Sequence, residues 1–152
     1  MPHMGTLGTP KAVPLDDQLC FDLYAASRAV TAAYRPVLTE LGLTYPQYLV
    51  LIVLWEHESS TVRDIAARLR LDHGTLTPLL KRMEAGGLVE RRRDDVDERL
   101  VVVSLAQRGE ALRQHAEAIH CDMVEQIGLV KDEFEQLQET LRLLTARVSP
   151  AT

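Results

Sequence analysis

Cys20 is the residue of this chain with the clearest chemical potential, because it lies in the run from Leu15 to Tyr24 near the start of a predicted helix. The unpaired backbone N–H groups in a helix's first turn lower the free-energy cost of forming a thiolate, which is the reactive form of cysteine. Three neighbouring acids oppose the thiolate: Asp16, Asp17 and Asp22. A reactive Cys20 therefore needs further polar support. The alternative is that Cys20 is a small core residue, as many free cysteines are.

A second chemical signal is a basic middle segment in an acidic chain. The 152 residues have a formal net charge of −5. Residues 63–99 carry nine Lys and Arg against eight Asp and Glu, whereas the remainder carries eight bases and fourteen acids. Binding to phosphates requires local positive charge, whatever the total charge is. A DNA-reading segment at residues 61–105, joined to a reactive thiol, predicts a redox-switched regulator.

The spacing of apolar residues predicts the elements that position these groups. Apolar residues step by three and four across residues 19–41, which predicts one long helix that is kinked at Pro36 and ended by Gly42. Residues 46–57 form a second helix that is apolar nearly all round. This second helix should lie at the centre of the fold.

Two shorter helices are predicted next. Thr61 is followed three residues later by an acid, which is an N-cap pattern for a compact third helix. Asp72 can cap a fourth helix at residues 73–85. Its interior Pro78 loses a backbone hydrogen bond, so this helix either starts later, near Thr75, or is bent. Its apolar face leaves four polar residues for solvent or DNA: Thr75, Thr77, Lys81 and Arg82.

A β-hairpin follows the fourth helix. The β-rich segments at residues 88–93 and 100–105 flank a charged loop at residues 94–99. Two short helices followed by a hairpin with a charged tip make a winged helix-turn-helix.

A helical pattern resumes at Ala106 and is interrupted near Gly128. We therefore predict a mainly α fold with a small β-hairpin wing.

The apolar stripes of the terminal helices indicate a homodimer, because a monomer of this size has no helix left to cover both. A two-fold dimer also matches a palindromic DNA site with half-sites roughly 34–36 Å apart. The predicted organisation is a flexible arm at residues 1–14, an N-terminal dimerisation helix at 15–45, a winged helix-turn-helix domain at 46–105 and C-terminal dimerisation helices at 106–152.

Several other classes of protein are disfavoured. The longest apolar run, Tyr48 to Trp55, is far shorter than the roughly 20 residues of a membrane helix, and the first ten residues lack the features of a signal peptide. We expect a cytoplasmic protein with no membrane association, no cofactor and no structural disulfide. A zinc site from His115, His120 and Cys121 is disfavoured, because two of these are sequence neighbours that point about 100° apart on a helix.

Six motifs, in order, resemble the MarR-type repressors, and in particular the OhrR branch of organic hydroperoxide sensors, over residues 15–148. They are Leu19–Arg28, Tyr34–Pro36, Thr44–Tyr48, Leu54–His57, Gly74–Pro78 and Asp97–Arg99. The resemblance implies a transcriptional repressor, not an enzyme, that binds double-stranded operator DNA as a dimer. It also implies release from DNA when an organic hydroperoxide oxidises the N-terminal cysteine.

The resemblance assigns the sensing role to Cys20 and the role of hydroxyl donors to Tyr34 and Tyr45 of the partner subunit. A rise of 1.5 Å per residue puts Cys20 and Tyr34 roughly 21 Å apart within one helix. The two can meet only between subunits, across an antiparallel pair of first helices. Tyr24, four residues after Cys20, could pack beside the thiol in the same chain. The alternative for each tyrosine is a core aromatic.

The resemblance also concerns the wing, where the acid Asp97 orients Arg99 for entry into the DNA minor groove. A narrow minor groove attracts arginine through its enhanced negative potential. The alternative is a solvated hairpin tip. We also expect Arg91 to contribute to DNA binding. The family often has a hydroxyl residue as the cap of the next helix, where this chain has Ala106, so Ser104 could supply the cap instead.

Cys121 lies in the predicted C-terminal helices. Some members of the branch carry a second cysteine there, which captures the oxidised sensor of the other subunit as a disulfide. The alternative is a buried structural cysteine, in which case a small cellular thiol would complete the switch.

Two other functions remain open on the sequence. The first is a thiol peroxidase that uses Cys20, although an enzyme would have no use for a basic wing. The second is a repressor that is released by a small aromatic ligand rather than by oxidation.

Overall fold

The computed structural model describes residues 11–150, and the chain divides into two compact units after Ala33. Within the described residues, the first unit contains the short 3-10 helix η1 (Leu15–Asp17) and the beginning of α1 (Leu19–Glu40). The predicted long N-terminal helix is confirmed, and it continues through Pro36. The turn after α1 contains Gly42 at a φ of 70°, a backbone conformation that glycine adopts without steric cost.

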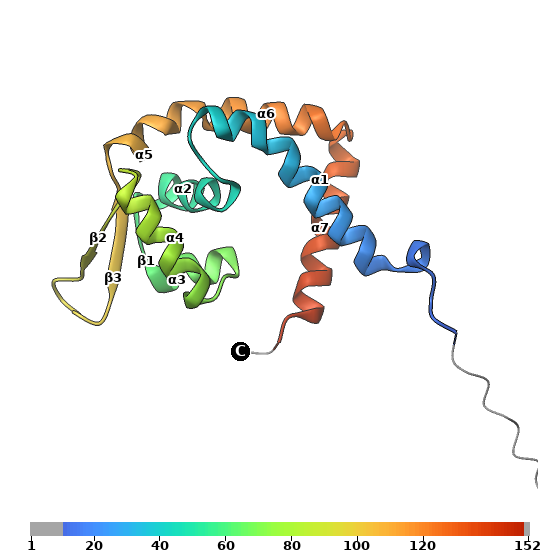
Figure 1. The fold of residues 1–152 in the computed structure, drawn as a ribbon, viewed down its shortest axis with the longest axis horizontal. Helices are drawn as coiled ribbons and strands as arrows, with labels where there is room; N and C mark the ends of the chain where they lie inside the picture. Colours follow the sequence, from blue (N-terminus) through green and yellow to red (C-terminus); the bar gives the residue numbers. More distant parts are fainter. Residues whose placement is uncertain (1–10, 151–152) are drawn as a thin grey trace, which may run out of the picture. The chain divides into compact units, whose positions relative to one another are not determined.

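The second unit begins at Tyr34 and contains the remaining elements (Figure 1). In chain order they are α2 (Tyr45–His57), β1 (Ser59–Thr61), α3 (Val62–Leu69), α4 (His73–Ala85), β2 (Val89–Arg93), β3 (Val101–Leu105), α5 (Gln107–Ala111), the 3-10 helix η2 (Leu112–His115), α6 (Ala116–Ile127) and α7 (Lys131–Val148). The predicted fold, mainly α with a small β wing, is confirmed.

Side-chain caps explain where the helices α2, α3 and α4 of the second unit begin. Thr44 and Gln47 form a reciprocal capping box at the start of α2. The Thr61 hydroxyl accepts a hydrogen bond of 3.1 Å from the backbone N–H of Asp64, which starts α3. The carboxylate of Asp72 accepts one of 2.7 Å from the backbone N–H of Thr75, which starts α4. Each cap satisfies an N–H group that has no partner within its own helix.

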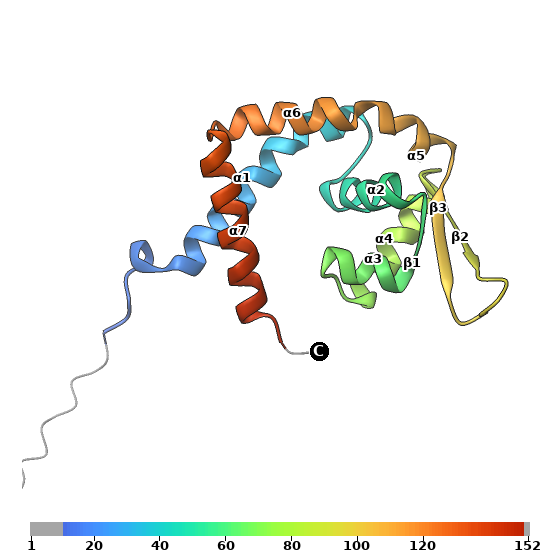
Figure 2. The ribbon, with the colours of Figure 1, turned by 180° about the vertical axis from the view of Figure 1, so that it is seen from behind.

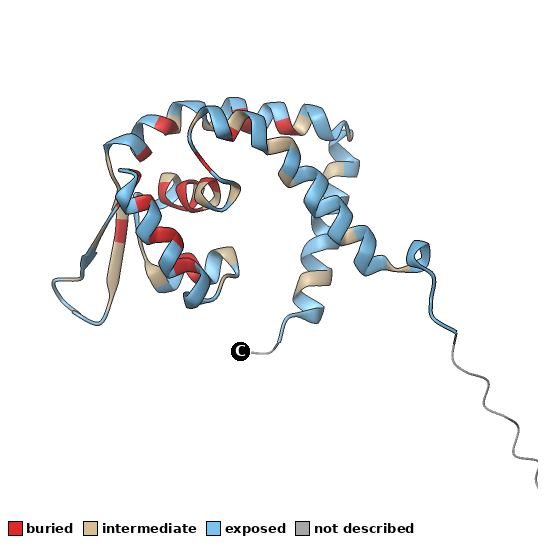
Figure 3. Cartoon of the chain, viewed as in Figure 1, coloured by how far each residue is buried: buried red, intermediate tan, exposed pale blue. Residues whose placement is uncertain are grey.

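The core of the second unit is built around α2, as the sequence predicted. Val50, Leu51 and Leu54 of this helix are 0% exposed. They belong to one cluster with residues from α3 and α4, including Ile65, Leu76, Leu80 and Met83. Buried residues concentrate on these central helices (Figure 3).

Within residues 11–150, no single helix is long and apolar enough to cross a bilayer. The helices α1 and α2 meet that test only when they are taken together as a bent pair.

Three antiparallel strands form the sheet in the order β1-β3-β2 (Figure 2). Val103 of the central strand pairs with Ser60 on one side and with Arg91 on the other, and it is fully buried. The hairpin of β2 and β3 was predicted from the sequence, whereas β1 was not. The three residues of β1 lack an alternating apolar pattern, so only their pairing with β3 defines them as a strand.

The structure corrects one prediction made from the sequence and decides between two alternatives for α4. The proposed cap at Ser104 is wrong, because this residue lies inside β3 and pairs with Ser59 and Glu90. Ala106 precedes α5 with no side-chain cap. The predicted bounds of α4 and its Asp72 cap are confirmed, and of the two alternatives the later start near Thr75 is excluded, since the helix starts at His73 with Pro78 inside it. The Asp72 cap and the buried face of α4 hold the helix despite the hydrogen bond that proline cannot donate.

Gly109 joins α5 to the rest of the unit through a close backbone contact. The Trp55 indole N–H donates a 3.0 Å hydrogen bond to the carbonyl of Gly109. A Cβ at this buried glycine would overlap the carbonyl oxygen of Leu88, which is backbone and cannot move aside easily. The contact therefore requires a residue without a side chain.

Gly109→Ala is expected to lower the free energy of unfolding by about 2–3 kcal/mol, because overpacking forces the backbone apart. Urea denaturation followed by circular dichroism measures this change. Gly74→Ala is the matched control, since its Cβ would meet only the Asp72 carboxylate at 3.4 Å. Equal stabilities of the two variants would contradict the packing role of Gly109.

Candidate functional site

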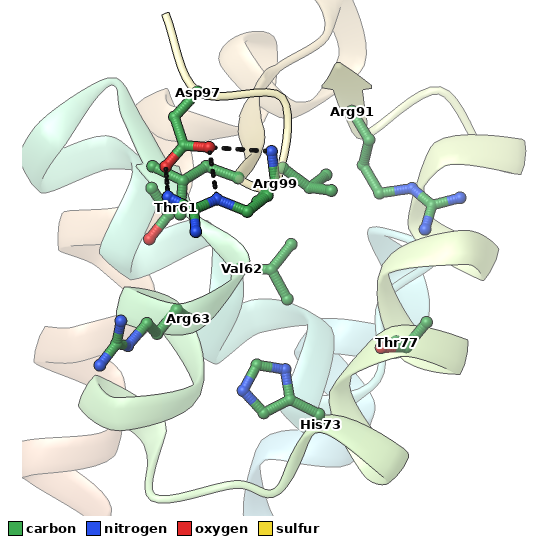
Figure 4. A pocket seen from close by; sticks show the side chains of 10 residues that line it. Thr61, Val62, Arg63, His73, Thr77, Arg91, Asp97 and Arg99 are labelled. Carbon is green, nitrogen blue, oxygen red and sulfur yellow. Dashed lines mark hydrogen bonds and ion pairs between the residues drawn. The ribbon is translucent and has the colours of Figure 1, made fainter. Parts of the chain in front are cut away.

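A groove of about 580 Å³ lies between α3, α4 and the wing, which is the hairpin of β2, β3 and their connecting loop (Figure 4). Its lining comes from the beginnings of both helices, from β2, and from the second half of the hairpin loop with the start of β3. The lining residues are Thr61, Val62, Arg63, His73, Thr77, Arg91, Asp97, Arg99, Leu100 and Val101. The groove therefore joins the start of the second helix of the helix-turn-helix to the predicted wing residues.

Asp97 holds Arg99 in a fixed orientation at the wing. The Nε and Nη2 groups of Arg99 donate hydrogen bonds of 3.0 and 3.2 Å to the two carboxylate oxygens of Asp97. The Arg99 backbone N–H donates a further bond of 3.1 Å to the same carboxylate (Figure 4). These bonds lower the pKa of Asp97, so the carboxylate stays charged. The Arg99 side chain remains 90% exposed, so it is oriented and also accessible to a nucleic acid.

Arg91 also lines the groove, but its charge is balanced within the protein. The carboxylate of Glu84 accepts bonds of 3.0 Å from the Arg91 backbone N–H and 3.1 Å from its guanidinium. These bonds lower the pKa of Glu84, and the Arg91 side chain is only 25% exposed. The pair ties β2 to α4, a contact that the sequence analysis did not foresee.

The predicted polar residues of α4 are all exposed, but the structure separates them into two groups. Thr77 lines the groove, whereas Thr75, Lys81 and Arg82 do not. The groove includes residues that the sequence analysis missed, notably Arg63 and His73. For His73, the available signal was its position at the start of α4, because residues at the beginning of a recognition helix contact base edges in helix-turn-helix proteins. Arg63 lies on α3 and had no such signal.

The structure places the two cysteines on exposed positions of different helices. Cys20 is the second residue of α1, and Cys121 lies within α6. Tyr24 is one turn from Cys20 in α1, and its ring lies under the guanidinium of Arg28 at 5.4 Å. Both cysteines are free and accessible, so the alternative that either is a buried core residue does not hold within this chain.

Tyrosines from α1 and α2 form a cluster within the second unit. The ring of Tyr34 lies 4.9 Å from that of Tyr45 and 5.8 Å from that of Tyr48, and Tyr48 in turn contacts Trp55. Burial raises the pKa of Tyr34 and Tyr45, and it raises the pKa of Tyr48 to about 12. The three phenols therefore stay protonated at neutral pH, so each keeps an O–H group that is able to donate a hydrogen bond.

The structure thus brings together Tyr34 and Tyr45, which the sequence analysis had named as a pair. It adds Tyr48, which was not among the residues predicted for the site. The signal for Tyr48 was its position three residues after Tyr45 in a helix, since residues with this spacing share a face.

Comparisons with known proteins agree with this geometry. The family model described as transcriptional regulator SarA/Rot matches residues 32–116. The organic hydroperoxide resistance transcriptional regulator of Bacillus subtilis (strain 168) is 49% identical over 125 residues, which cover 82% of this chain and 83% of the relative.

Solved structures of AbfR, a protein of Staphylococcus epidermidis, are also similar. Overoxidized AbfR bound to DNA is 40% identical with a TM-score of 0.66, covering 86% of this chain and 95% of that one. Disulfide-formed AbfR is 38% identical with a TM-score of 0.60, covering 86% and 91%. The family model spans more than half of the chain, the B. subtilis relative is similar over most of its own length, and the fold is a winged helix-turn-helix. The chain belongs to the MarR-type winged helix-turn-helix transcriptional regulators.

Proposed function

We propose that this protein is a repressor that binds operator DNA as a homodimer and leaves it when an organic hydroperoxide oxidises Cys20. The observation that carries the proposal is that one chain combines an oriented, exposed wing arginine with an exposed thiol in the first turn of α1. The B. subtilis relative is named for resistance to organic hydroperoxide, which supports this oxidant.

DNA binding is assigned to the wing and α4. Arg99 enters the minor groove, where its charge and the orientation set by Asp97 both favour binding. Thr77 at the groove, with Thr75 nearby in the first turn of α4, contacts base edges in the major groove. Lys81, Arg82 and Arg91 contribute positive charge toward phosphates, although Glu84 partly neutralises Arg91. AbfR has been solved bound to DNA, which supports this assignment.

A homodimer would cover apolar surface that this chain leaves exposed. The helix α7 contains no buried residue (Figure 3). Its large apolar side chains are accessible, and so are several of α1: Leu19, Phe21, Tyr24, Val30, Leu137, Leu141, Leu143 and Val148. Exposed apolar side chains that recur along one helix, as in each of these two helices taken by itself, are typical of an interaction site. We assign dimerisation to residues 15–45 and 106–152, and DNA binding to residues 46–105.

The sensing reaction starts from the Cys20 thiolate. It attacks the terminal oxygen of the hydroperoxide, the O–O bond breaks, and the alkoxide takes a proton to leave as the alcohol. The product is a sulfenic acid at Cys20. Protonated Tyr34 and Tyr45 of the partner subunit would donate hydrogen bonds to the thiolate and so stabilise it. In the reducing cytoplasm, where we place the protein, Cys20 is a free thiol before the signal.

Tyr34→Phe is expected to slow the oxidation of Cys20 by roughly tenfold, because a hydrogen bond to a charged group contributes about 1.5–3 kcal/mol. The substitution keeps the ring, so packing against Tyr45 is retained. The rate is measured by thiol labelling after timed exposure to cumene hydroperoxide, with Tyr24→Phe as a variant from the same chain's α1. An unchanged rate for Tyr34→Phe would reduce its role to packing.

We further propose that Cys121 resolves the sulfenic acid by forming a disulfide with Cys20 of the other subunit. The Cys121 thiolate attacks the Cys20 sulfur, the S–O bond breaks, and the hydroxide takes a proton to leave as water, so the sulfenic acid is replaced by a more stable disulfide. AbfR has also been solved in a disulfide form, which supports such a step. Non-reducing electrophoresis after peroxide should show a covalent dimer in wild type and none in Cys121→Ser. A monomer that still releases DNA would instead indicate a small cellular thiol as the resolving group.

Titration of the protein–operator complex tests the function as a whole. Fluorescence anisotropy of a labelled operator should fall as cumene hydroperoxide is added, with the end point near one equivalent per subunit. A reductant should restore the complex, and hydrogen peroxide provides the comparison oxidant. Continued consumption of peroxide in the presence of a thiol reductant, without release of DNA, would indicate a thiol peroxidase instead.

A further inference from the structure

Arg108 binds the ends of two helices that lie far apart in the sequence. Its Nη2 group donates hydrogen bonds of 2.9 Å to the carbonyl of Leu41 and 3.3 Å to that of Gly42, just after α1. Its Nη1 group donates one of 3.1 Å to the carbonyl of Gly86, just after α4. We call this set of contacts the Arg108 clasp. It belongs entirely to the second unit.

The chemistry of these acceptors suits an arginine in particular. The last carbonyls of a helix have no partner within that helix and carry a partial negative charge, so a nearby cation is stabilising. The planar guanidinium presents its donors in a fixed fork. One Arg108 side chain therefore serves two helix ends at once, which a lysine ammonium on a flexible stem does less well.

The surrounding backbone leaves room for this side chain. A Cβ at Gly42 would lie 2.5 Å from Nη2 of Arg108, and one at Gly86 would lie 3.6 Å from Nη1. Gly42 also has a positive φ of 70°. The approach of the guanidinium to the end of α1 thus depends on a glycine.

The position of Arg108 on α5 connects the clasp to the wing. Only Ala106 and Gln107 separate Arg108 from β3, and the backbone N–H of Ala106 donates a 3.0 Å bond to the carbonyl of Leu88. The next residue, Gly109, accepts the indole bond of Trp55. Three parts of the protein therefore meet at Arg108: the end of the helix that carries Cys20, the end of α4, and the base of the wing.

We propose that Arg108 is a positioning residue that transmits the oxidation of Cys20 from α1 to α4 and the wing. This rests on the proposed function. A shift of α1 moves the carbonyls of Leu41 and Gly42, and the shared guanidinium passes that displacement to the carbonyl of Gly86. Without the clasp, α1 could move while α4 keeps its DNA-binding position, so sensing and release would become separate.

The test compares Arg108→Met and Arg108→Lys with wild type in the full-length chain. For each protein, the operator Kd is measured by anisotropy in the reduced state and after one equivalent of cumene hydroperoxide. The rate of Cys20 oxidation is followed in parallel by thiol labelling. Arg113→Met is the matched control, because Arg113 lies five residues further on and, within residues 11–150, its guanidinium pairs locally with Glu110 at 3.0 Å.

The ratio of oxidised to reduced Kd reports the transmission between the two sites. We expect Arg108→Met to reduce this ratio at least tenfold relative to wild type, while the oxidation rate of Cys20 stays unchanged. Arg108→Lys should retain part of the ratio, and Arg113→Met should retain all of it. This pattern is not expected from a purely structural role, which would change stability but leave the ratio intact.

A wild-type ratio in a folded Arg108→Met protein would overturn the proposal, and so would an equal loss in Arg113→Met. If Arg108→Met does not fold, Arg108→Lys decides, and an unchanged ratio in that variant overturns the proposal. Failure of the proposed function looks different, because wild type itself would then show the same Kd before and after oxidation.

Discussion

Cys20→Ser is expected to bind the operator with the affinity of wild type and to remain bound at peroxide doses that release wild type completely. Serine keeps the size and polarity of the side chain, but its hydroxyl cannot form a sulfenic acid. The exposed position of Cys20 in α1 means that the substitution removes no core packing. The expected effect is therefore the loss of the whole response, with no change in the reduced complex.

Anisotropy of a labelled operator during a cumene hydroperoxide titration measures this difference. Cys121→Ser is the matched control, since it removes the other free thiol from an exposed helical position. It should still release DNA on oxidation, because the sulfenic acid forms at Cys20. Release of Cys20→Ser at wild-type doses would remove Cys20 from the sensing role and leave Cys121 as the candidate.

Arg99→Ala is expected to weaken operator binding by about tenfold or more, because loss of an arginine that contacts DNA costs roughly 1–3 kcal/mol. Each dimer would lose one such contact at each of its two wings. The rate of Cys20 oxidation and the dimer should be unchanged, since Arg99 hydrogen-bonds only to Asp97 among the described residues. Operator affinity is measured at two salt concentrations. Analytical ultracentrifugation measures the dimer, and thiol labelling measures the oxidation rate.

Two variants separate the orientation of Arg99 from its charge. Asp97→Asn retains the arginine but weakens the bidentate contact, so it should lower affinity by less than Arg99→Ala. Lys11→Ala removes one positive charge from the other unit of the chain and should leave affinity unchanged. If Arg99→Ala binds the operator like wild type, the wing is a solvated loop and not a DNA contact.

The sequence predicted most helix boundaries because local signals define them. Thr61 and Asp72 each cap a helix at the predicted position, and Gly42 and Gly128 lie in the turns that end α1 and α6. The strand β1 was missed because its pairing with β3 bridges more than forty residues. No local pattern in a three-residue polar segment can reveal such a partner.

The candidate site was also predicted only in part, because contacts between residues close in sequence can be predicted and contacts between distant residues cannot. Asp97 and Arg99 lie two residues apart, so their contact follows from the local sequence. The pairing of Arg91 with Glu84 depends on how β2 packs against α4, which composition does not reveal. Arg108 was overlooked because its three acceptors are backbone carbonyls, and a sequence shows backbone groups at every position.

The contact between Glu84 and Arg91 fixes the distance between α4 and the wing. Because one carboxylate grips both the backbone and the side chain of β2, the wing cannot swing freely away from α4. In the proposed complex, the distance between the minor-groove and major-groove contacts of one half-site is therefore set by the protein before DNA arrives. Each half-site would then have a fixed length. Binding to operators of different total length would require a change in the spacing between the two subunits.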